Sequence, residues 1–216
     1  MRIERLQYIT HTIDGYTHQQ QVEDVCKGGV KWIQLRMKKA TADEIITVAK
    51  EVRAICDAFQ ATFILNDHVE LVNEVNADGV HIGKEDMDSI TARKIIGNDK
   101  IIGCTTNTID DVMNVSKLNI DYIGLGPFCF TKTKEKLSPI LGLDGYRHII
   151  SQMNILGITL PVIAIGGIEQ NDIPSLMNIG IHGVALSGVI HRTNNIIQTT
   201  TEIINTIYHE TSYNSR

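Results

Sequence analysis

Short apolar runs alternate with longer amphipathic stretches along the 216-residue chain. The short runs have the length and composition of buried strands, and they predict strands at 6–10, 32–36, 62–66, 79–82, 100–104, 121–125, 161–165 and 183–187. Between and after them, apolar spacing predicts helices near 17–28, 41–58, 68–76, 87–96, 108–118, 143–155, 170–179 and 193–209. Thr41 opens a capping-box sequence, TADE, and Asp172 precedes Pro174 in a predicted first turn.

Eight strand-then-helix units predict a parallel sheet that is covered by helices. Eight strands close a (β/α)8 TIM barrel, whereas an open doubly wound sheet usually has about five to seven. No linker or break in composition divides the chain. We therefore expect one α/β domain over 1–216, with a barrel core at about 5–190 and a C-terminal helix at about 193–209. The active site of such a barrel lies at the C-terminal ends of its strands.

Charge and composition narrow the class of protein. Twenty-five acidic residues against twenty Lys and Arg give a net charge of −5, which argues against general binding of nucleic acid or anionic membranes. No apolar run approaches the roughly 20 residues that span a bilayer, and the N-terminus lacks a signal-peptide pattern, so we expect a cytoplasmic protein. The four cysteines form no CxxC pair, and we expect reduced thiols in or near the core.

The segment QLRMK ends the second predicted strand with polar side chains at alternate positions. Gln34, Arg36 and Lys38 share one face of an extended chain, and the apolar residues between them share the other. An arginine beside a lysine is costly to bury unless an anion compensates the charge. The trio therefore predicts an anionic ligand at the barrel mouth. The alternative is that Arg36 and Lys38 pair with carboxylates from neighbouring loops.

Carboxylates follow the next two predicted strands. Asn66 and Asp67 end the third, and Asp86 follows the fourth in the segment GKEDM. Mg²⁺ prefers one or two carboxylates together with water and substrate phosphates, so this pair beside cations favours a magnesium site. The alternative is that Asp86 caps a helix that begins near Ser89.

The loop after the sixth predicted strand, with the sequence TKTK, combines hydroxyls and ammonium groups. In an extended chain Thr131 and Thr133 face one side and Lys132 and Lys134 the other, so one loop could contact two phosphate groups. Gly167 and Gly188 follow the seventh and eighth strands, where backbone N–H groups can approach an oxyanion. Tight turns alone would also explain both glycines.

Two more polar residues have more than one interpretation. Thr105 follows the fifth predicted strand, where its hydroxyl could bind a phosphate oxygen, but threonine is also common in strands. His81 lies late in the fourth strand and is interpreted as a core residue with an internal partner. No spacing of the histidines indicates a metal site.

Seven segments stand in the order of one known family: QLRMK, ILNDHVEL, ADGVHIGKEDM, IIGCTTN, DYIGLGPFCFTKTKEK, PVIAIGGI and GVALSGVI. Through them the chain resembles the thiamine-phosphate synthase family over about residues 5–190. The resemblance implies a transferase of thiamine biosynthesis. Such an enzyme joins a hydroxymethylpyrimidine diphosphate to a hydroxyethylthiazole phosphate, through a pyrimidinylmethyl cation, and releases pyrophosphate.

The resemblance also implies roles for individual residues. Mg²⁺ as cofactor would be held by Asp67 and Asp86. The pyrimidine diphosphate would be held by Gln34, Arg36, Lys38, Asn66 and Lys134. The thiazole phosphate would be held by Thr131, Thr133, Gly167, Ser187 and Gly188. Thr105 keeps a hydroxyl at a substrate position. Arg36, Lys38 and Lys134 would be catalytic, because they oppose the charge that grows on the leaving group.

Several positions depart from the family pattern. Lys84 stands where glutamine is usual, Asn107 where histidine is usual, FCFT at 128–131 where IFPT is usual, and the Ser187–Gly188 pair is atypical. One alternative is a thiazole tautomerase-like isomerase, but asparagine at 107 is a poor general acid or base. The other is a non-catalytic barrel that binds phosphate ligands. Phosphorylated small molecules are the expected partners, and the sequence leaves a homo-oligomer open.

Overall fold

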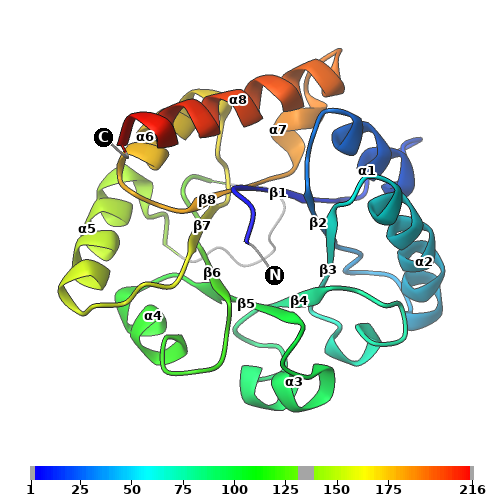
Figure 1. Ribbon diagram of the computed structural model, residues 1–216, viewed down its shortest axis with the longest axis horizontal. Coiled ribbons are helices and arrows are strands. Elements are labelled where there is room, and N and C mark those ends of the chain that lie inside the picture. The colour runs from blue at the N-terminus through cyan, green and yellow to red at the C-terminus, as the bar shows by residue number, and fades with distance from the viewer. Residues whose placement is uncertain (1–2, 131–138, 215–216) are drawn as a thin grey trace.

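The computed structural model describes residues 3–130 and 139–214, with side chains to 209, and its strands close into a barrel. The parallel strands follow one another around the ring in chain order, and the last pairs with the first (Figure 1). They are β1 (Leu6–Ile9), β2 (Trp32–Leu35), β3 (Thr62–Asn66), β4 (Gly79–Ile82), β5 (Ile101–Thr106), β6 (Tyr122–Leu125), β7 (Val162–Ile165) and β8 (Gly183–Leu186). The predicted strands and the (β/α)8 barrel are confirmed.

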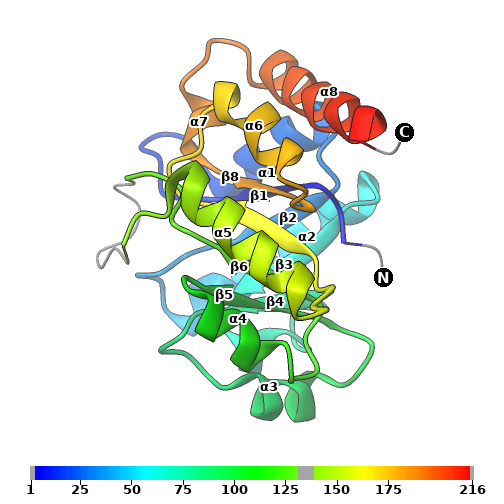
Figure 2. The same ribbon diagram turned by 90° about the vertical axis from the view of Figure 1, so that its left-hand side faces the viewer.

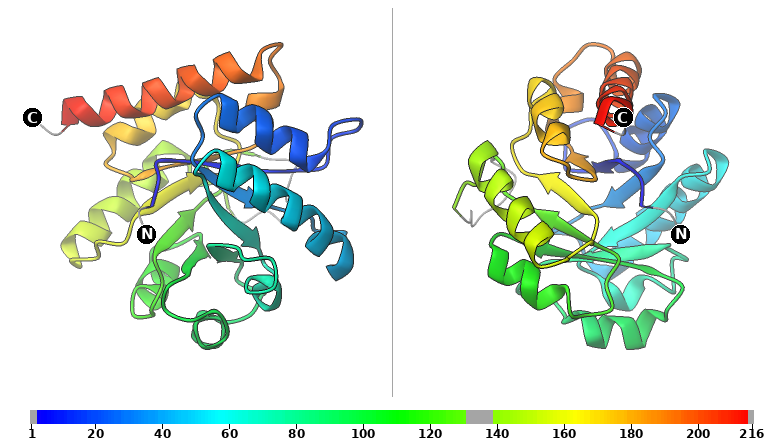
Figure 3. Two further views of the ribbon diagram at one scale, coloured as in Figure 1. Left: turned by 45° about the vertical axis from the view of Figure 1, so that its right-hand side comes forward. Right: turned by 60° about the vertical axis from the view of Figure 1, so that its left-hand side comes forward.

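The α-helices lie outside the ring of strands (Figure 1). They are α1 (His18–Lys27), α2 (Ala42–Ala58), α3 (Ser89–Ile96), α4 (Ile109–Val115), α5 (Gly142–Ile155), α6 (Ile173–Asn178), α7 (Gly188–His191) and α8 (Ile196–Asn214). Figures 2 and 3 show α8 lying along α6 and beside α1, so the C-terminal helix covers the β1–β8 side of the barrel. In the two described ranges, none of the helices has the length and apolar character that a membrane crossing requires.

The predicted helix at 68–76 is wrong. Only a 3-10 helix, η1 (Val69–Leu71), forms there, and turns follow it. Residues 67–78 form the whole connection from β3 to β4. An α-helix there would also need a loop at each of its ends, and the connection is too short for all three. The apolar spacing had a different cause, since Val69, Val72 and Val75 are buried in the core from this short loop. A second 3-10 helix, η2 (Gln170–Asp172), precedes α6, where Pro174 stands in the first turn as predicted.

The core has two parts because successive strand residues point to opposite faces of the sheet. Outward residues such as Phe63 and Val80 pack in one large cluster with the buried faces of the helices. Inward residues form a separate cluster of Ile9, Trp32, Ile64, Ile101, Tyr122, Ile163 and Ala185. Residues two positions further along the strands therefore point inward as well, one layer closer to the C-terminal end.

The predicted location of the cysteines in or near the core is confirmed. Cys26, Cys56 and Cys104 are buried, Cys129 is partly exposed, and all four are free thiols.

The predicted capping box begins α2. The Thr41 hydroxyl accepts the Glu44 N–H at 3.4 Å, and the Glu44 carboxylate accepts the Thr41 N–H at 2.7 Å. We expect Thr41→Ala to lower the free energy of unfolding by about 1 kcal/mol, because a helix N–H loses its acceptor. Urea denaturation would show this as a lower midpoint. The control is Thr47→Ala on the same helix, which removes an exposed hydroxyl that plays no part in the cap. Equal midpoints for the two variants would contradict the role of the cap.

Candidate active site

A cavity of about 730 Å³ lies at the C-terminal ends of the strands. Every predicted site residue within the described ranges lines it, namely Gln34, Arg36, Lys38, Asn66, Asp67, Asp86, Thr105, Gly167, Ser187 and Gly188. The remaining predicted site residues, Thr131, Thr133 and Lys134, lie outside the described residues. Side chains from distant parts of the chain therefore meet in one hollow, at the place where a barrel of this kind carries its active site.

Two of the cations that line the cavity come from the end of β2. The Arg36 N–H donates to Thr10 Oγ1 at 3.0 Å, which ties this segment to the end of β1, and the Arg36 side chain is half-buried. Lys38 Nζ lies 3.5 Å from Asp67 Oδ2, so the ion-pair interpretation holds for this lysine. Both cations nevertheless line the cavity. The polar side chains at the end of β2 therefore point toward the barrel mouth, as expected.

The two carboxylates lie together between the ends of β3 and β4. Burial of Asp67, together with the adjoining Asp86 carboxylate, raises the pKa of Asp67 to about 6. Asp67 also has a φ of 68°, a left-handed conformation that is uncommon outside glycine and often found at functional sites. Lys38 offsets part of the charge of these two carboxylates, and a proton or a divalent cation would compensate the rest.

The capping interpretation of Asp86 is wrong. Asp88 is the N-cap of α3, with its Oδ1 accepting the Thr91 N–H at 2.9 Å. The Asp86 Oδ2 accepts the Gly83 N–H at 2.8 Å, which fixes its carboxylate beside the cavity. The sequence placed the cap two residues too early, because both aspartates precede Ser89 closely.

Gly167 combines a turn with a close approach of two segments. Its φ is 68°, and a Cβ at this position would lie 2.6 Å from the Phe130 carbonyl oxygen. The tight-turn interpretation is therefore sufficient to explain this glycine, although it also lines the cavity. Of the atypical phenylalanines, Phe130 lines the cavity, whereas Phe128 is buried with its ring centroid 5.8 Å from that of Tyr146.

Two histidines in the cavity were not expected from the sequence. His11 Nδ1 lies 2.8 Å from Ser187 Oγ, and His191 Nε2 is hydrogen-bonded to the Tyr8 hydroxyl. Burial and the nearby Arg36 lower the pKa of His11, and burial and His11 lower that of His191 to about 4. His11 could have been found by continuing the inward alternation of β1. His191 could not, because it lies on α7, which the sequence did not predict.

His81 is both a core residue and part of the cavity wall. Its Nδ1 lies 2.9 Å from the Tyr122 hydroxyl and its Nε2 lies 3.0 Å from Thr105 Oγ1. The expected internal partner is therefore confirmed, but the sequence interpretation missed that the ring also lines the cavity.

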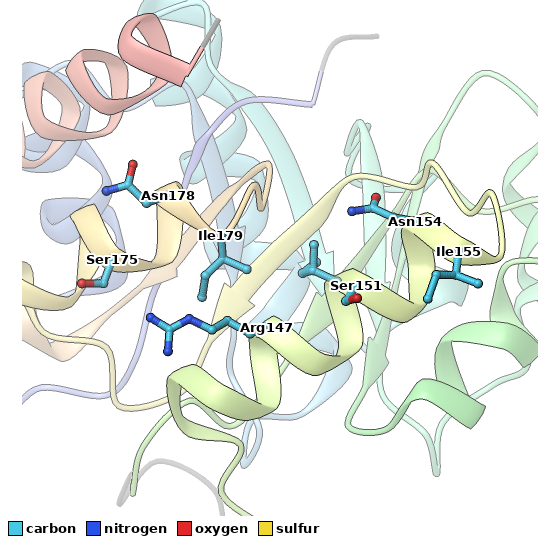
Figure 4. A pocket seen from close by; sticks show the side chains of 8 residues that line it. Arg147, Ser151, Asn154, Ile155, Ser175, Asn178 and Ile179 are labelled. Atoms are coloured by element: carbon cyan, nitrogen blue, oxygen red, sulfur yellow. The ribbon is translucent and has the colours of Figure 1, made fainter.

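A second cavity, of about 600 Å³, lies on the outside of the barrel between α5 and α6 (Figure 4). Its cation, Arg147, already pairs with Asp144 at 2.9 Å, and the remaining labelled side chains are neutral. This cavity offers none of the carboxylate and cation chemistry gathered at the strand ends, so the candidate active site is the one inside the barrel mouth.

Comparison with known proteins supports the family resemblance seen in the sequence. A family model described as thiamine monophosphate synthase matches residues 6–190. The chain belongs to the thiamine monophosphate synthase family. A Phocaeicola vulgatus member named thiamine-phosphate synthase is 50% identical over 200 residues, which are 93% of this chain and 96% of the relative. A Flavobacterium psychrophilum protein of the same name is 45% identical over 202 residues, covering 92% and 97%.

Solved structures agree in fold. A thiamine phosphate pyrophosphorylase from Pyrococcus furiosus superposes with a TM-score of 0.84 at 27% identity, covering 95% of this chain and 96% of that one. One from Bacteroides thetaiotaomicron gives 0.67 at 14% identity, with coverage of 94% and 96%, and shows likeness of fold alone. The family resemblance inferred from the ordered motifs is therefore confirmed.

Two departures from the family pattern have structural partners in this chain. The Lys84 ammonium pairs with Asp111, and Lys84 does not line the cavity. The Asn107 side-chain amide donates to the Gly126 carbonyl, and Asn107 is buried. Both residues are thus engaged in connections between neighbouring strand-end loops.

Proposed function

We propose that this chain is a thiamine-phosphate synthase, which joins 4-amino-5-hydroxymethyl-2-methylpyrimidine diphosphate to hydroxyethylthiazole phosphate and releases pyrophosphate. The observation that carries the proposal is the cavity at the strand ends. It combines the cations Arg36 and Lys38 with the carboxylate pair of Asp67 and Asp86. Close relatives of that name, matched over nearly the whole chain, support the same activity.

The main requirement of this reaction is that the protein stabilises the departing diphosphate. Once the bond to the diphosphate breaks, the pyrimidinylmethyl cation needs no strong nucleophile or base from the protein. Arg36 and Lys38 would bind the diphosphate and oppose the negative charge that grows as it departs. Gln34 and Asn66, both buried at the inner face, would hold the pyrimidine end in line with the thiazole nitrogen.

The residues present fit a divalent cation. The carboxylates of Asp67 and Asp86 are close enough to raise the pKa of one of them, as expected where a cation is to be held between them. Within residues 3–130 and 139–209, no group of three or more His, Cys, Asp and Glu side chains is arranged to hold a metal ion, so a metal site of that kind is absent there. Mg²⁺, with water and diphosphate completing its ligands, would neutralise charge on the leaving group.

The thiazole phosphate is assigned to the opposite side of the cavity. Gly167 follows β7, and Ser187 and Gly188 follow β8, where backbone N–H groups can meet a phosphate. Thr131 and Thr133 are assigned to the same phosphate from the sequence. The location in the cytoplasm stays a prediction, and the sequence leaves open whether the chain forms a homo-oligomer.

The decisive experiment is an assay with both phosphorylated substrates. Purified protein with Mg²⁺ should form thiamine phosphate, detected by fluorescence after oxidation, and pyrophosphate in equal amount. Binding of both substrates without product would favour the non-catalytic barrel. Isomerisation of a thiazole phosphate alone would favour the tautomerase, although asparagine at 107, bonded to Gly126, offers no proton-transfer group for it.

Lys134→Ala tests the assignment of the loop after β6. We expect kcat/KM for the diphosphate substrate to fall about tenfold or more, because an ammonium group would no longer oppose the leaving-group charge. Lys132→Ala in the same loop is the matched control and should have a much smaller effect, because the family resemblance assigns no role to Lys132. Equal kcat/KM for Lys134→Ala and the unmodified protein would contradict the role of Lys134.

A further inference from the structure

A chain of hydrogen bonds crosses the interior of the barrel and ends at the cavity. Gln7 Nε2 donates to the Tyr122 hydroxyl at 3.2 Å, and that hydroxyl lies 2.9 Å from His81 Nδ1. His81 Nε2 lies 3.0 Å from Thr105 Oγ1, and Thr105 lines the cavity. Gln7, Tyr122 and His81 are 1%, 0% and 7% exposed, so water is excluded from most of this chain.

The barrel provides space for these rings at two glycines. A Cβ at Gly103 would overlap the Tyr122 ring, and a Cβ at Gly124 would lie 2.8 Å from His81 Cε1. Gly103 on β5 is in register with both His81 and Tyr122, whereas Gly124 lies on β6 in register with Thr105. Trp32 packs edge-on against Tyr122, with ring centroids 4.8 Å apart. The rings are therefore held in one arrangement by their surroundings.

The direction of each hydrogen bond follows from the donors available. Burial raises the pKa of Tyr122, so the phenol keeps its proton at neutral pH. The amide N–H of Gln7 donates to this hydroxyl, the Gln34 side chain also interacts with it, and the phenol proton needs an acceptor of its own. His81 Nδ1 lies in position to accept it. The remaining ring nitrogen, Nε2, then carries the histidine proton and donates to Thr105 Oγ1.

We propose that Tyr122 and His81 are positioning residues that fix the Thr105 hydroxyl as a hydrogen-bond donor directed into the cavity. Because Thr105 Oγ1 accepts from His81, its own proton is left to be donated to a ligand. The ligand must therefore present a hydrogen-bond acceptor at this point of the wall. The orientation follows from the protein alone. The assignment of this acceptor to the pyrimidine diphosphate rests on the proposed function.

The tautomer of His81 tests the orientation without any substrate. In ¹⁵N-labelled protein at neutral pH, long-range ¹⁵N–¹H spectra should show His81 as the neutral form protonated at Nε2, assigned by its loss in His81→Gln. Tyr122→Phe removes the donor to Nδ1, and the His81 nitrogen signals should move toward a mixture of tautomers. Tyr146→Phe is the matched control, because its buried hydroxyl bonds to Leu125 and not to His81. A His81 protonated at Nδ1 in the unmodified protein would overturn the proposal.

Kinetics test whether the chain acts through Thr105. Tyr122→Phe is expected to lower kcat/KM about tenfold, as for the loss of one well-placed hydrogen bond. Thr105→Val should lower it at least as much, and the double variant should be no worse than Thr105→Val alone. If the loss of kcat/KM in the double variant equalled the product of the two single losses, the link between Tyr122 and Thr105 would be overturned. If the unmodified protein forms no thiamine phosphate, the proposed function fails, while the His81 tautomer still decides the orientation.

Discussion

Asp86→Asn is expected to lower Mg²⁺-dependent kcat/KM by about a hundredfold or more, the usual effect of losing a group that stabilises transition-state charge. Asparagine keeps the size of the side chain and can still accept the Gly83 N–H. It removes the negative charge that would hold the cation beside Asp67. Steady-state kinetics over a range of Mg²⁺ concentrations would measure the loss.

The same substitution is expected to raise the stability of the metal-free protein by about 1 kcal/mol, after allowance for solvent screening. Burial and then Asp86 raise the pKa of Asp67 from 3.8 to about 6, so the folded state binds a proton more tightly than the unfolded chain. Stability contributed by that proton is present at low pH and is lost as the pH rises from 3.8 to about 6. Urea denaturation across this pH range should show a smaller decline in the free energy of unfolding for Asp86→Asn than for the unmodified protein.

Thermal unfolding with and without Mg²⁺ separates the loss of cation binding from the change in stability of the metal-free protein. A cation that binds only the folded state raises the melting temperature, and it should do so for the unmodified protein but not for Asp86→Asn. Asp88→Asn is the matched control, because asparagine caps α3 about as well as aspartate and Asp88 does not line the cavity. Full Mg²⁺-dependent activity in Asp86→Asn would contradict the assignment of the metal site.

Arg36→Leu is expected to weaken the binding of inorganic pyrophosphate with Mg²⁺ about tenfold to a hundredfold, because charge-assisted hydrogen bonds are lost. Folding should be retained, since the backbone bond from residue 36 to Thr10 does not need the guanidinium. Calorimetric titration would measure the change. The control is Arg147→Leu, whose cation is paired with Asp144 outside the barrel. Unchanged affinity in Arg36→Leu would leave the polar face of β2 without a role in binding.

Arg36→Leu should also change the titration of His11. The guanidinium contributes, after burial, to the lowered pKa of His11. Its removal should therefore raise that pKa, because protonation of the imidazole would no longer meet a nearby positive charge. An NMR titration of the histidine ring protons would measure the shift, and an unchanged pKa would place the two side chains further apart than the structure does.

Much of the barrel and its site was predictable because local patterns decide it. Each strand is a short apolar run that must be buried on both faces, and the strand period of two fixes which residues point inward. Gln34, Arg36 and Lys38 follow directly from that alternation. Asn66, Thr105 and Gly167 follow from their places at strand ends, because parallel strands bring those ends to one rim.

Other features depended on contacts between distant segments, which no local pattern contains. The spacing of Val69, Val72 and Val75 is helical, but the short connection between β3 and β4 allowed only η1 and turns. His11 meets Ser187 across 176 positions of chain only because β1 pairs with β8 to close the ring.

The sequence by itself determined the strand order, the inward polar positions and the family, because burial and alternation act within a few residues. Only the tertiary structure decided which side chains touch. It placed Asp67 against Asp86, and it placed Tyr122 between Gln7 and His81. The reason is geometric: closing a twisted sheet sets the distances between strands, and those distances decide which polar groups share a proton or a charge.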